Sequence, residues 1–204
     1  MKKYIFVISI LAMALTSCSG GKQADAQKAA QQAVIDNIMT RTSIRAYTSD
    51  PVPADVVETL LRAGMAAPSA MNGQPWEFVV INDRDSLDKL AGSLRYARML
   101  KGAPLAIAVC GHSTFTDREG NVRESKFWVD DCSAATENIL LAAHALGLGA
   151  VWTAARDDRA DVVREALGIP EEINPLCVIV LGYPAENPQP KDKWKPEKVH
   201  WNRY

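Results

Sequence analysis

The sequence predicts one domain of mixed helices and strands, packed around a single central helix. Between residues 128 and 146, apolar side chains recur at steps of three and four, the spacing that places them on one face of a helix. The runs 105–110 and 177–181 are short and apolar, as expected of strands near the centre of a sheet. A chain of 204 residues is long enough to give one such domain a substantial core.

The helix predicted over residues 128–146 is apolar on its second face as well, and His144 is the only polar residue of its last two turns. A helix that is apolar all round is normally enclosed on every side. We therefore interpret it as the core helix, with a dimer interface as a further role. His144 is expected to be a hydrogen-bonded core residue rather than a ligand. Gly147 and Gly149 end the helix, and a short strand follows over residues 150–153.

The same patterns predict the other elements. Residues 112–123 are polar and form a candidate loop over a site. After Gly182 the chain is rich in proline and basic residues and has no core-forming period, so we expect this tail to lie on a partner subunit. An aspartate at position 83 or 85 is expected to cap one helix. The remaining elements are helices over residues 34–39, 54–66, 85–94 and 160–167 and a strand over residues 76–82.

The first segment predicts an export signal rather than part of the fold. Two lysines follow Met1, and residues 4–15 are apolar but too short to span a bilayer comfortably. The segment ends in Leu-Thr-Ser-Cys, which resembles the lipobox of bacterial lipoproteins, where the cysteine carries the lipid. We therefore expect a signal peptide over residues 1–17, a lipid anchor on Cys18 and a location in the cell envelope. An uncleaved membrane anchor is the alternative. Residues 18–33 read as a flexible or loosely helical tether to a domain at residues 34–204.

Composition and motifs exclude several functional classes. The formal net charge of −1 gives no reason to expect a nucleic-acid partner. The three histidines lack metal-ligand spacing, and the common signatures of hydrolases, phosphate-binding loops and dinucleotide-binding domains are absent. Beyond Cys18, the three remaining cysteines favour buried, inert thiols, although a disulfide between Cys110 and Cys132 stays open.

Two loops carry the residue types of a binding site. The segment Arg41-Thr42-Ser43-Ile44-Arg45 places two guanidinium groups and two hydroxyls within five residues, a set suited to a phosphate. Solvated surface arginines are the alternative explanation. The loop over residues 68–76 holds Asn72 and Gln74, whose amides offer both donors and acceptors to the edge of a heterocycle such as a flavin pyrimidine ring.

Together these segments resemble the nitroreductase-like family of flavoproteins. The motifs are Arg-x-Ser-x-Arg from residue 41, Ala-Pro-Ser-x-x-Asn-x-Gln-Pro-Trp from residue 67, Leu-Gly-Leu-Gly and Trp-Thr within residues 146–153, and Leu-Gly-Ile-Pro, Gly-Tyr-Pro and the C-terminal residues further on. The resemblance implies an α+β fold with a mainly antiparallel sheet flanked by helices. It also implies an intertwined homodimer with FMN at the subunit interface.

The resemblance also assigns the FMN site, residue by residue. Arg41, Ser43 and Arg203 would hold the phosphate beside Thr42, and Arg45 would lie near the pyrimidine ring. Another contact is expected within residues 94–101, where Arg95, Tyr96, Arg98 and Lys101 compete. The loop residues come from the other subunit, and a backbone N–H of the strand reaches the flavin ring. The loop residues are Pro68, Ser69, Ala70, Asn72 and Gln74. The strand residues are Trp152, Thr153 and Ala154.

The resemblance implies an oxidoreductase in which FMN carries the chemistry, so that no catalytic side chain and no metal is required. NAD(P)H would donate electrons and a nitroaromatic, quinone or related small aromatic acceptor would take them in a second step. A lipidated protein faces away from the cytosolic nicotinamide pool, which leaves another donor open. A reductive dehalogenase of the same family and a non-catalytic flavin-binding envelope protein are the alternatives.

Overall fold

The computed structural model describes residues 23–204 of the chain, which divides into two units at residue 40. The signal peptide predicted over residues 1–17 and the lipid anchor predicted on Cys18 lie outside these residues. Residues 23–40 form one continuous helix, so residues 23–33 take the helical form of the predicted tether. Four apolar side chains of this helix are exposed within two turns: Val34, Ile35, Ile38 and Met39.

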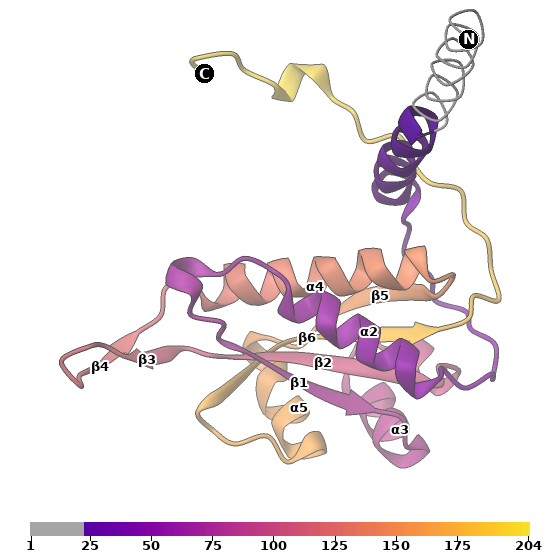
Figure 1. Cartoon of the computed structure of the whole chain (residues 1–204). Coiled ribbons are helices and arrows are strands. Elements are labelled where there is room, and N and C mark those ends of the chain that lie inside the picture. Colours follow the sequence, from indigo (N-terminus) through magenta and orange to yellow (C-terminus); the bar gives the residue numbers. More distant parts are fainter. Residues whose placement is uncertain (1–22) are drawn as a thin grey trace, which may run out of the picture. The chain divides into compact units, whose positions relative to one another are not determined.

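The second unit is built on a four-stranded antiparallel sheet with the strand order β1-β2-β6-β5. Strands β2 and β6 are central and β1 and β5 form the two edges, as Figure 1 shows. The α+β class expected from the sequence is therefore confirmed. The strands are β1 (Trp76–Ile81), β2 (Leu105–His112), β5 (Gly149–Ala154) and β6 (Ile173–Gly182).

Helices cover both faces of the sheet (Figure 1). Because side chains alternate along a strand, Leu105, Ile107 and Val109 of β2 face one core while Ala106 and Ala108 face the other. The first core lies under α2 and α4, and the second under α3 and α5. This explains why the central strands are apolar throughout rather than alternating. The helices are α2 (Ala54–Met65), α3 (Arg84–Ser93), α4 (Trp128–Ala145) and α5 (Ala160–Leu167).

Helix α4 is the predicted core helix, about 27 Å long, and its first face is buried against the sheet and α2. Its second face is only partly covered within the chain. On that face Leu141 is half-buried and Ala145 is exposed, whereas Ala142 belongs to the first face and packs against the core. Leu146 was expected on the buried face, and it is exposed because the helix ends at Ala145. The apolar second face is therefore available to another molecule.

Local caps fix the helix boundaries that the sequence predicts. The carboxylate of Asp83 accepts a hydrogen bond from the N–H of Ser86 (2.8 Å) at the start of α3. That bond lowers the pKa of Asp83 below its usual range. Helix α5 ends at Gly168, which adopts the left-handed conformation that favours glycine (φ 66°).

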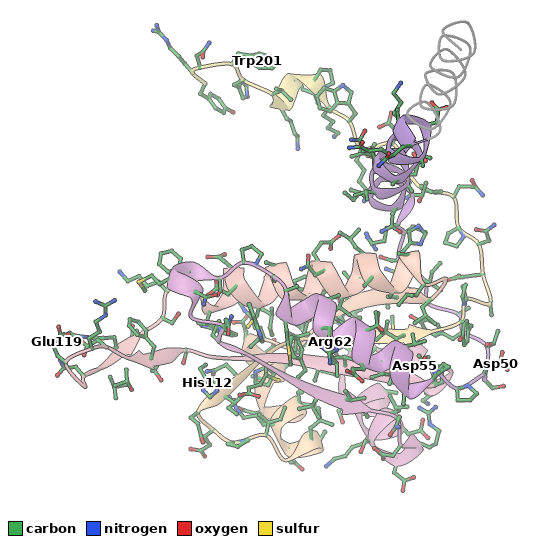
Figure 2. All side chains as sticks on the ribbon, in the orientation of Figure 1. Asp50, Asp55, Arg62, His112, Glu119 and Trp201 are labelled. Atoms are coloured by element: carbon green, nitrogen blue, oxygen red, sulfur yellow. The ribbon has the colours of Figure 1, made fainter. Side chains whose placement is uncertain are left out.

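The polar segment after β2 forms a hairpin rather than the expected loop. Strands β3 (Thr114–Thr116) and β4 (Val122–Glu124) pair antiparallel. Asp117 organises the turn, because it accepts from the N–H of Asn121 (2.8 Å) and pairs with Arg123 (2.9 Å). The bond from Arg123 is the main reason that the pKa of Asp117 is lowered. Figure 2 shows His112 at the base of the hairpin and Glu119 near its tip.

The tail after β6 is exposed over most of its length, and Trp201 is 85% exposed (Figure 2). Short 3₁₀ turns connect several of the elements, and within residues 23–204 no helix combines the length and the apolar character needed to cross a bilayer. The 3₁₀ turns are η1 (Ala70–Asn72), η2 (Arg98–Lys101), η3 (Asp157–Arg159) and η4 (Pro196–Lys198).

Candidate functional site

The predicted phosphate-binding segment lies along the outer edge of β5. Ser43 pairs with Ala150 as an isolated parallel bridge, and the N–H of Ile44 donates to the carbonyl of Ala150 (3.1 Å). Gly149 makes this approach possible, since a Cβ there would come within 2.6 Å of the Ile44 side chain. Gly149 therefore allows the segment that contains Arg41 and Ser43 to pack against the edge of β5.

The residues that follow β6 hold the same segment from its other end. Tyr47 bridges Pro184, and the N–H of Ala185 donates to the carbonyl of Ala46 (2.9 Å). The Tyr47 hydroxyl lies within hydrogen-bond distance of two carbonyl oxygens, those of Ile44 (2.5 Å) and Val180 (3.1 Å). Burial raises the pKa of Tyr47 well above its usual value, so this hydroxyl remains a donor.

The side chains of this segment differ in how deeply they are buried. The Arg41 guanidinium packs against α4, where its Nε lies 3.7 Å from a carboxylate oxygen of Glu137. Its side chain is only 19% exposed, which holds the charge in one place. Thr42 and Ser43 are half-buried beside it, and Arg45 is exposed. The Arg41 guanidinium and the hydroxyls of Thr42 and Ser43 therefore lie near the start of β5, and Arg45 follows two residues further along the segment.

The far end of the β5 edge offers unpaired backbone groups. The Ala150 carbonyl points outward to Ile44, and backbone groups alternate in direction along an antiparallel strand. The N–H groups of Trp152 and Ala154 therefore also point outward, while the N–H of Ala155 points inward to Leu176 (3.1 Å). In residues 23–204 no group pairs with the outward N–H groups of Trp152 and Ala154. This edge can donate to a planar ring laid against it.

Thr153 supplies a further unpaired donor beside that edge. Its hydroxyl is buried and has no hydrogen-bond partner in the part of the chain that the structure describes. Such a group costs free energy unless a ligand satisfies it. Trp152, by alternation, turns to the opposite face of β5 and is 38% exposed. The orphaned hydroxyl and the free strand edge fit a cofactor with hydrogen-bonding atoms on a flat ring, as the flavin of FMN has.

A small cavity of about 190 Å³ opens next to Thr153. Arg95 and Tyr96 line it from the turn after α3, whereas Arg98 and Lys101 do not, so the structure favours the first two for the contact left open within residues 94–101. Arg159 of η3 also lines the cavity, and the charged run of residues 156–159 to which it belongs is interpreted from the sequence either as part of the substrate entrance or as a solvated turn. The full lining is Leu94, Arg95, Tyr96, Thr153, Ala154 and Arg159.

The predicted loop of residues 68–76 lies at the opposite edge of the sheet, where its last residue begins β1. Three strand spacings separate the two edges, about 14 Å. The loop is rigidly built: the Ala70 N–H donates to Asp131 (2.9 Å), and the side chains of Asn72 and Gln74 bond each other (3.2 Å). Both amide side chains are exposed. One chain therefore does not bring this loop to the β5 edge.

The loop also carries unusual backbone strain. Met71, Asn72 and Gln74 all have positive φ values, of 52°, 55° and 46°. Side chains larger than glycine rarely adopt this conformation, and strained residues cluster at functional sites. The strain agrees with a binding role for Asn72 and Gln74.

Arg203 is not brought to the other predicted phosphate ligands. It lies in the exposed tail, where its N–H donates to the carbonyl of Trp201 (2.8 Å). The rings of His200 and Tyr204 stack at the same end of the tail, with 4.1 Å between their centroids. If Arg203 binds the FMN phosphate, it must do so at a surface other than the sheet and helices of its own unit.

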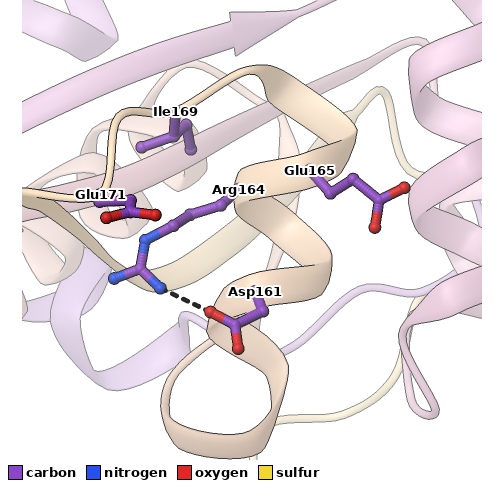
Figure 3. A pocket seen from close by; sticks show the side chains of 5 residues that line it. All are labelled: Asp161, Arg164, Glu165, Ile169 and Glu171. Atoms are coloured by element: carbon purple, nitrogen blue, oxygen red, sulfur yellow. Dashed lines mark hydrogen bonds and ion pairs between the residues drawn. The ribbon is translucent and has the colours of Figure 1, made fainter.

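A surface hollow of about 580 Å³ lies beside α5, and none of the residues that line it is a predicted site residue. Figure 3 shows its single arginine, Arg164, bonded to Asp161 (2.8 Å). The same guanidinium donates to Asn174 (2.9 Å), which fastens α5 to β6. Arg164 is therefore a structural residue, and the other side chains that line the hollow are Glu165, Ile169 and Glu171.

The three cysteines of the second unit are buried free thiols, as expected. Cys132 donates to the carbonyl of Cys110 (3.4 Å), so the two side chains that could have formed a disulfide are reduced. Burial raises the pKa of each thiol, including Cys177, to about 12. These thiols are inert core residues and take no part in the site.

Comparison with known proteins identifies the family. The profile described as the Nitroreductase family matches residues 38–96 and 92–183. A protein of Methanothermobacter thermautotrophicus, provisionally named NADH dehydrogenase/NAD(P)H nitroreductase, is 43% identical over 179 residues, which are 87% of this chain and 91% of that protein.

Solved structures agree with this match. A Bacteroides thetaiotaomicron structure with the same provisional name has 50% identity and a TM-score of 0.78, covering 84% of this chain and 98% of that one. An FMN-dependent nitroreductase from Clostridium difficile R20291 has 32% identity and a TM-score of 0.73, covering 83% and 99%. With its α+β fold, its antiparallel sheet and the matched residues 38–183, this chain belongs to the nitroreductase family.

Proposed function

We propose that this protein is an FMN-dependent oxidoreductase that passes electrons from NAD(P)H to nitroaromatic, quinone or related small aromatic acceptors in two successive half-reactions. The observation that carries the proposal is the outer edge of β5. There the two-arginine segment, two unpaired backbone N–H groups and the orphaned Thr153 hydroxyl lie along one strand. The family membership and the FMN dependence of a solved relative support the same cofactor.

The positions along β5 suggest how the cofactor is oriented. Ser43 sits opposite Ala150 and Thr153 follows three residues later, a separation of about 10 Å along a strand. Arg41 and Ser43, with Thr42 beside them, hold the phosphate at the start of the strand. The backbone N–H groups of residues 152 and 154 would hold the ring at the far end of the strand.

When bound, FMN supplies the redox chemistry, taking up electrons from the nicotinamide and giving them to the acceptor. The contribution of the chain is binding, orientation and electrostatics. Arg45 places a positive charge near the pyrimidine ring, where it stabilises the negative charge of the reduced state. Arg95 and Tyr96 border the cavity beside the ring and shape the approach of the aromatic substrate.

We further propose that the active form is a homodimer in which each site uses two chains. The β5 edge and the loop with Asn72 and Gln74 lie at opposite edges of one sheet. A two-fold dimer would bring the loop of one chain to the β5 edge of the other. The second face of α4, which is only partly covered within the chain, supplies apolar surface for such an interface.

Absorbance spectroscopy tests the proposed cofactor and donor. The purified domain of residues 22–204 should show a flavin spectrum that NADPH or NADH bleaches without oxygen and that a quinone restores. A bound flavin that neither nicotinamide reduces would point to another donor or to a non-catalytic binder. A protein that takes up no FMN after incubation would overturn the site.

Mixed dimers test the sharing of the site. Arg41→Ala and the double variant Asn72→Ala/Gln74→Ala should each bind FMN weakly alone. If the loop acts on the partner, mixing the two variants restores roughly a quarter of the sites, because each mixed dimer then holds one intact site. If the loop acts on its own chain, every site keeps a defect and mixing restores nothing.

The N-terminal prediction completes the proposal. A lipid on Cys18 would place the domain in the cell envelope at the end of its helical tether. Expression of the full chain in bacteria with a labelled fatty acid should label the protein, and Cys18→Ser should abolish the label. An unlabelled wild-type protein recovered from the cytosol would contradict the lipid anchor. The cytosolic NAD(P)H pool would then be within reach as the electron donor.

A further inference from the structure

Glu186 makes an unexpected contact with the predicted flavin-binding segment. It lies four residues beyond the end of β6, in the exposed tail. One of its carboxylate oxygens accepts hydrogen bonds from two consecutive backbone N–H groups, those of Arg45 and Ala46 (3.2 Å to Ala46). A carboxylate bonded to backbone donors makes charge-assisted bonds, which are stronger than neutral ones.

Within residues 23–204 the contact leaves the Arg45 guanidinium without an ion-pair partner. No carboxylate of the described chain lies within ion-pair distance of its guanidinium, although Glu186 is a near neighbour through the backbone. The acid therefore fixes the backbone of Arg45 without neutralising its charge. An acid that served only to balance the arginine would pair with the guanidinium instead.

Glu186 completes a three-point attachment of this segment. Pro184 bridges Tyr47, and Ala185 donates to the carbonyl of Ala46. Glu186 adds the two N–H groups just before Tyr47. The exposed Arg45 thereby projects from a backbone whose polar groups are held on both sides, so its direction is set by the residues that follow β6.

We propose that Glu186 is a positioning residue for Arg45, and that this contact raises the preference of the site for reduced over oxidised flavin. The proposal rests on the proposed function, in which Arg45 lies near the pyrimidine ring. Its new content is that an acidic side chain assists the binding of a negatively charged reduced state. It does so because the positive charge of Arg45, which Glu186 holds near the flavin, affects the reduced flavin more than the negative charge of Glu186 itself.

Geometry and charge predict opposite effects, which makes the proposal testable. If Glu186 acted through its own negative charge, its removal would favour the reduced flavin. If Glu186 positions Arg45, its removal lets the guanidinium move away and disfavours the reduced flavin. The reduction potential of bound FMN measures this preference directly, and a simple loss of fold would not shift it in a defined direction.

The experiment compares Glu186→Ala, Glu186→Gln and Glu186→Asp in the FMN-loaded full-length protein. Glu186→Ala should lower the affinity ratio of reduced to oxidised flavin about tenfold, a shift of about −30 mV for a two-electron couple. Glu186→Gln keeps an acceptor oxygen at the same reach, so its potential should equal or slightly exceed that of the wild type. Glu186→Asp keeps the charge but falls short by one methylene and should behave like Glu186→Ala.

The double variant Glu186→Ala/Arg45→Ala provides the coupling control. If Glu186 acts through Arg45, its removal should no longer lower the potential once Arg45 is gone, and only the small rise from the lost negative charge should remain. Should Glu186→Ala fail to fold, the Gln and Asp variants still separate the two roles. A raised potential in Glu186→Gln together with an unchanged one in Glu186→Asp would overturn positioning in favour of charge.

The wild-type protein separates this proposal from the one on which it rests. A wild type that binds no FMN overturns the proposed function before any variant is compared. If the wild type binds FMN and all three Glu186 variants have the same reduction potential as the wild type, only the role of Glu186 is overturned.

Discussion

The backbone of Gly149 lies directly against the side chain of Ile44: a Cβ at Gly149 would come within 2.6 Å of the Ile44 Cγ2 atom and 2.7 Å of its Cβ. Ile44 is buried, and its neighbours Ser43 and Arg45 carry predicted contacts to the cofactor. The shape of one glycine at the start of β5 therefore determines where the phosphate-binding segment sits.

Gly149→Ala should displace this segment. We expect a loss of stability of about 1–3 kcal/mol from overpacking and an FMN affinity lowered about tenfold or more, because the segment moves from the strand edge. Thermal unfolding and a fluorescence titration with FMN measure the two effects. Gly92→Ala in α3 is the matched control, since a Cβ at Gly92 meets nothing within 4 Å. Equal FMN affinities in both variants would contradict the assignment.

Arg41→Ala should weaken FMN binding by about 10- to 100-fold, the loss of a hydrogen bond to a charged group. Riboflavin, which lacks the phosphate, should bind wild type and variant alike. Arg62→Ala is the control: Arg62 pairs with Glu58 on the surface of α2 (2.6 Å) and is 76% exposed. An unaltered flavin content in Arg41→Ala would defeat the phosphate assignment.

Thr153→Val should separate stability from binding. In the absence of FMN it removes an orphaned hydroxyl, so the free energy of unfolding should stay equal or rise by up to about 1 kcal/mol. With FMN the variant lacks a hydrogen bond, so affinity should fall about five- to tenfold. Thr59→Val on α2, whose hydroxyl donates to Asp55 within its own helix (2.9 Å), should change neither binding nor spectrum. A Thr153→Val protein that binds FMN normally would show that the hydroxyl faces no ligand.

The thiols of the folded domain should not react with a disulfide reagent at neutral pH. Burial raises the pKa values of Cys110, Cys132 and Cys177 to about 12, so the reactive thiolate forms only when the pH approaches that value or when the chain unfolds. The domain of residues 22–204 should show no reactive thiol when native and all three after denaturation. A fast-reacting native thiol would mean that the core opens locally.

The sequence predicted the elements well where their signals are local. The apolar periods of α4 and the central strands come from neighbouring residues, and Asp83 and Gly168 mark their helix ends by side-chain and backbone chemistry. The hairpin after β2 was missed, because its short polar strands have no buried face to create an alternating pattern. Its order comes instead from Asp117, whose partners lie within six residues.

The site was predicted as a set of residue types, but its geometry was not predictable. The lining of the cavity by Arg95, Tyr96 and Arg159 depends on how the end of α3 meets β5 and η3, about sixty residues apart in sequence. The Glu186 contact spans 141 residues and has no local signature. Such contacts follow from tertiary packing, which no periodicity reports.

The position of the two binding segments on opposite edges of the sheet has a consequence for how the protein keeps its cofactor. If each flavin is held by two chains, cofactor loading and subunit association are linked equilibria, and each strengthens the other. Dilution should then release flavin even though no residue has changed, and excess FMN should resist that release. Retention of FMN would depend on protein concentration, and tethering many copies to one membrane would raise that concentration locally.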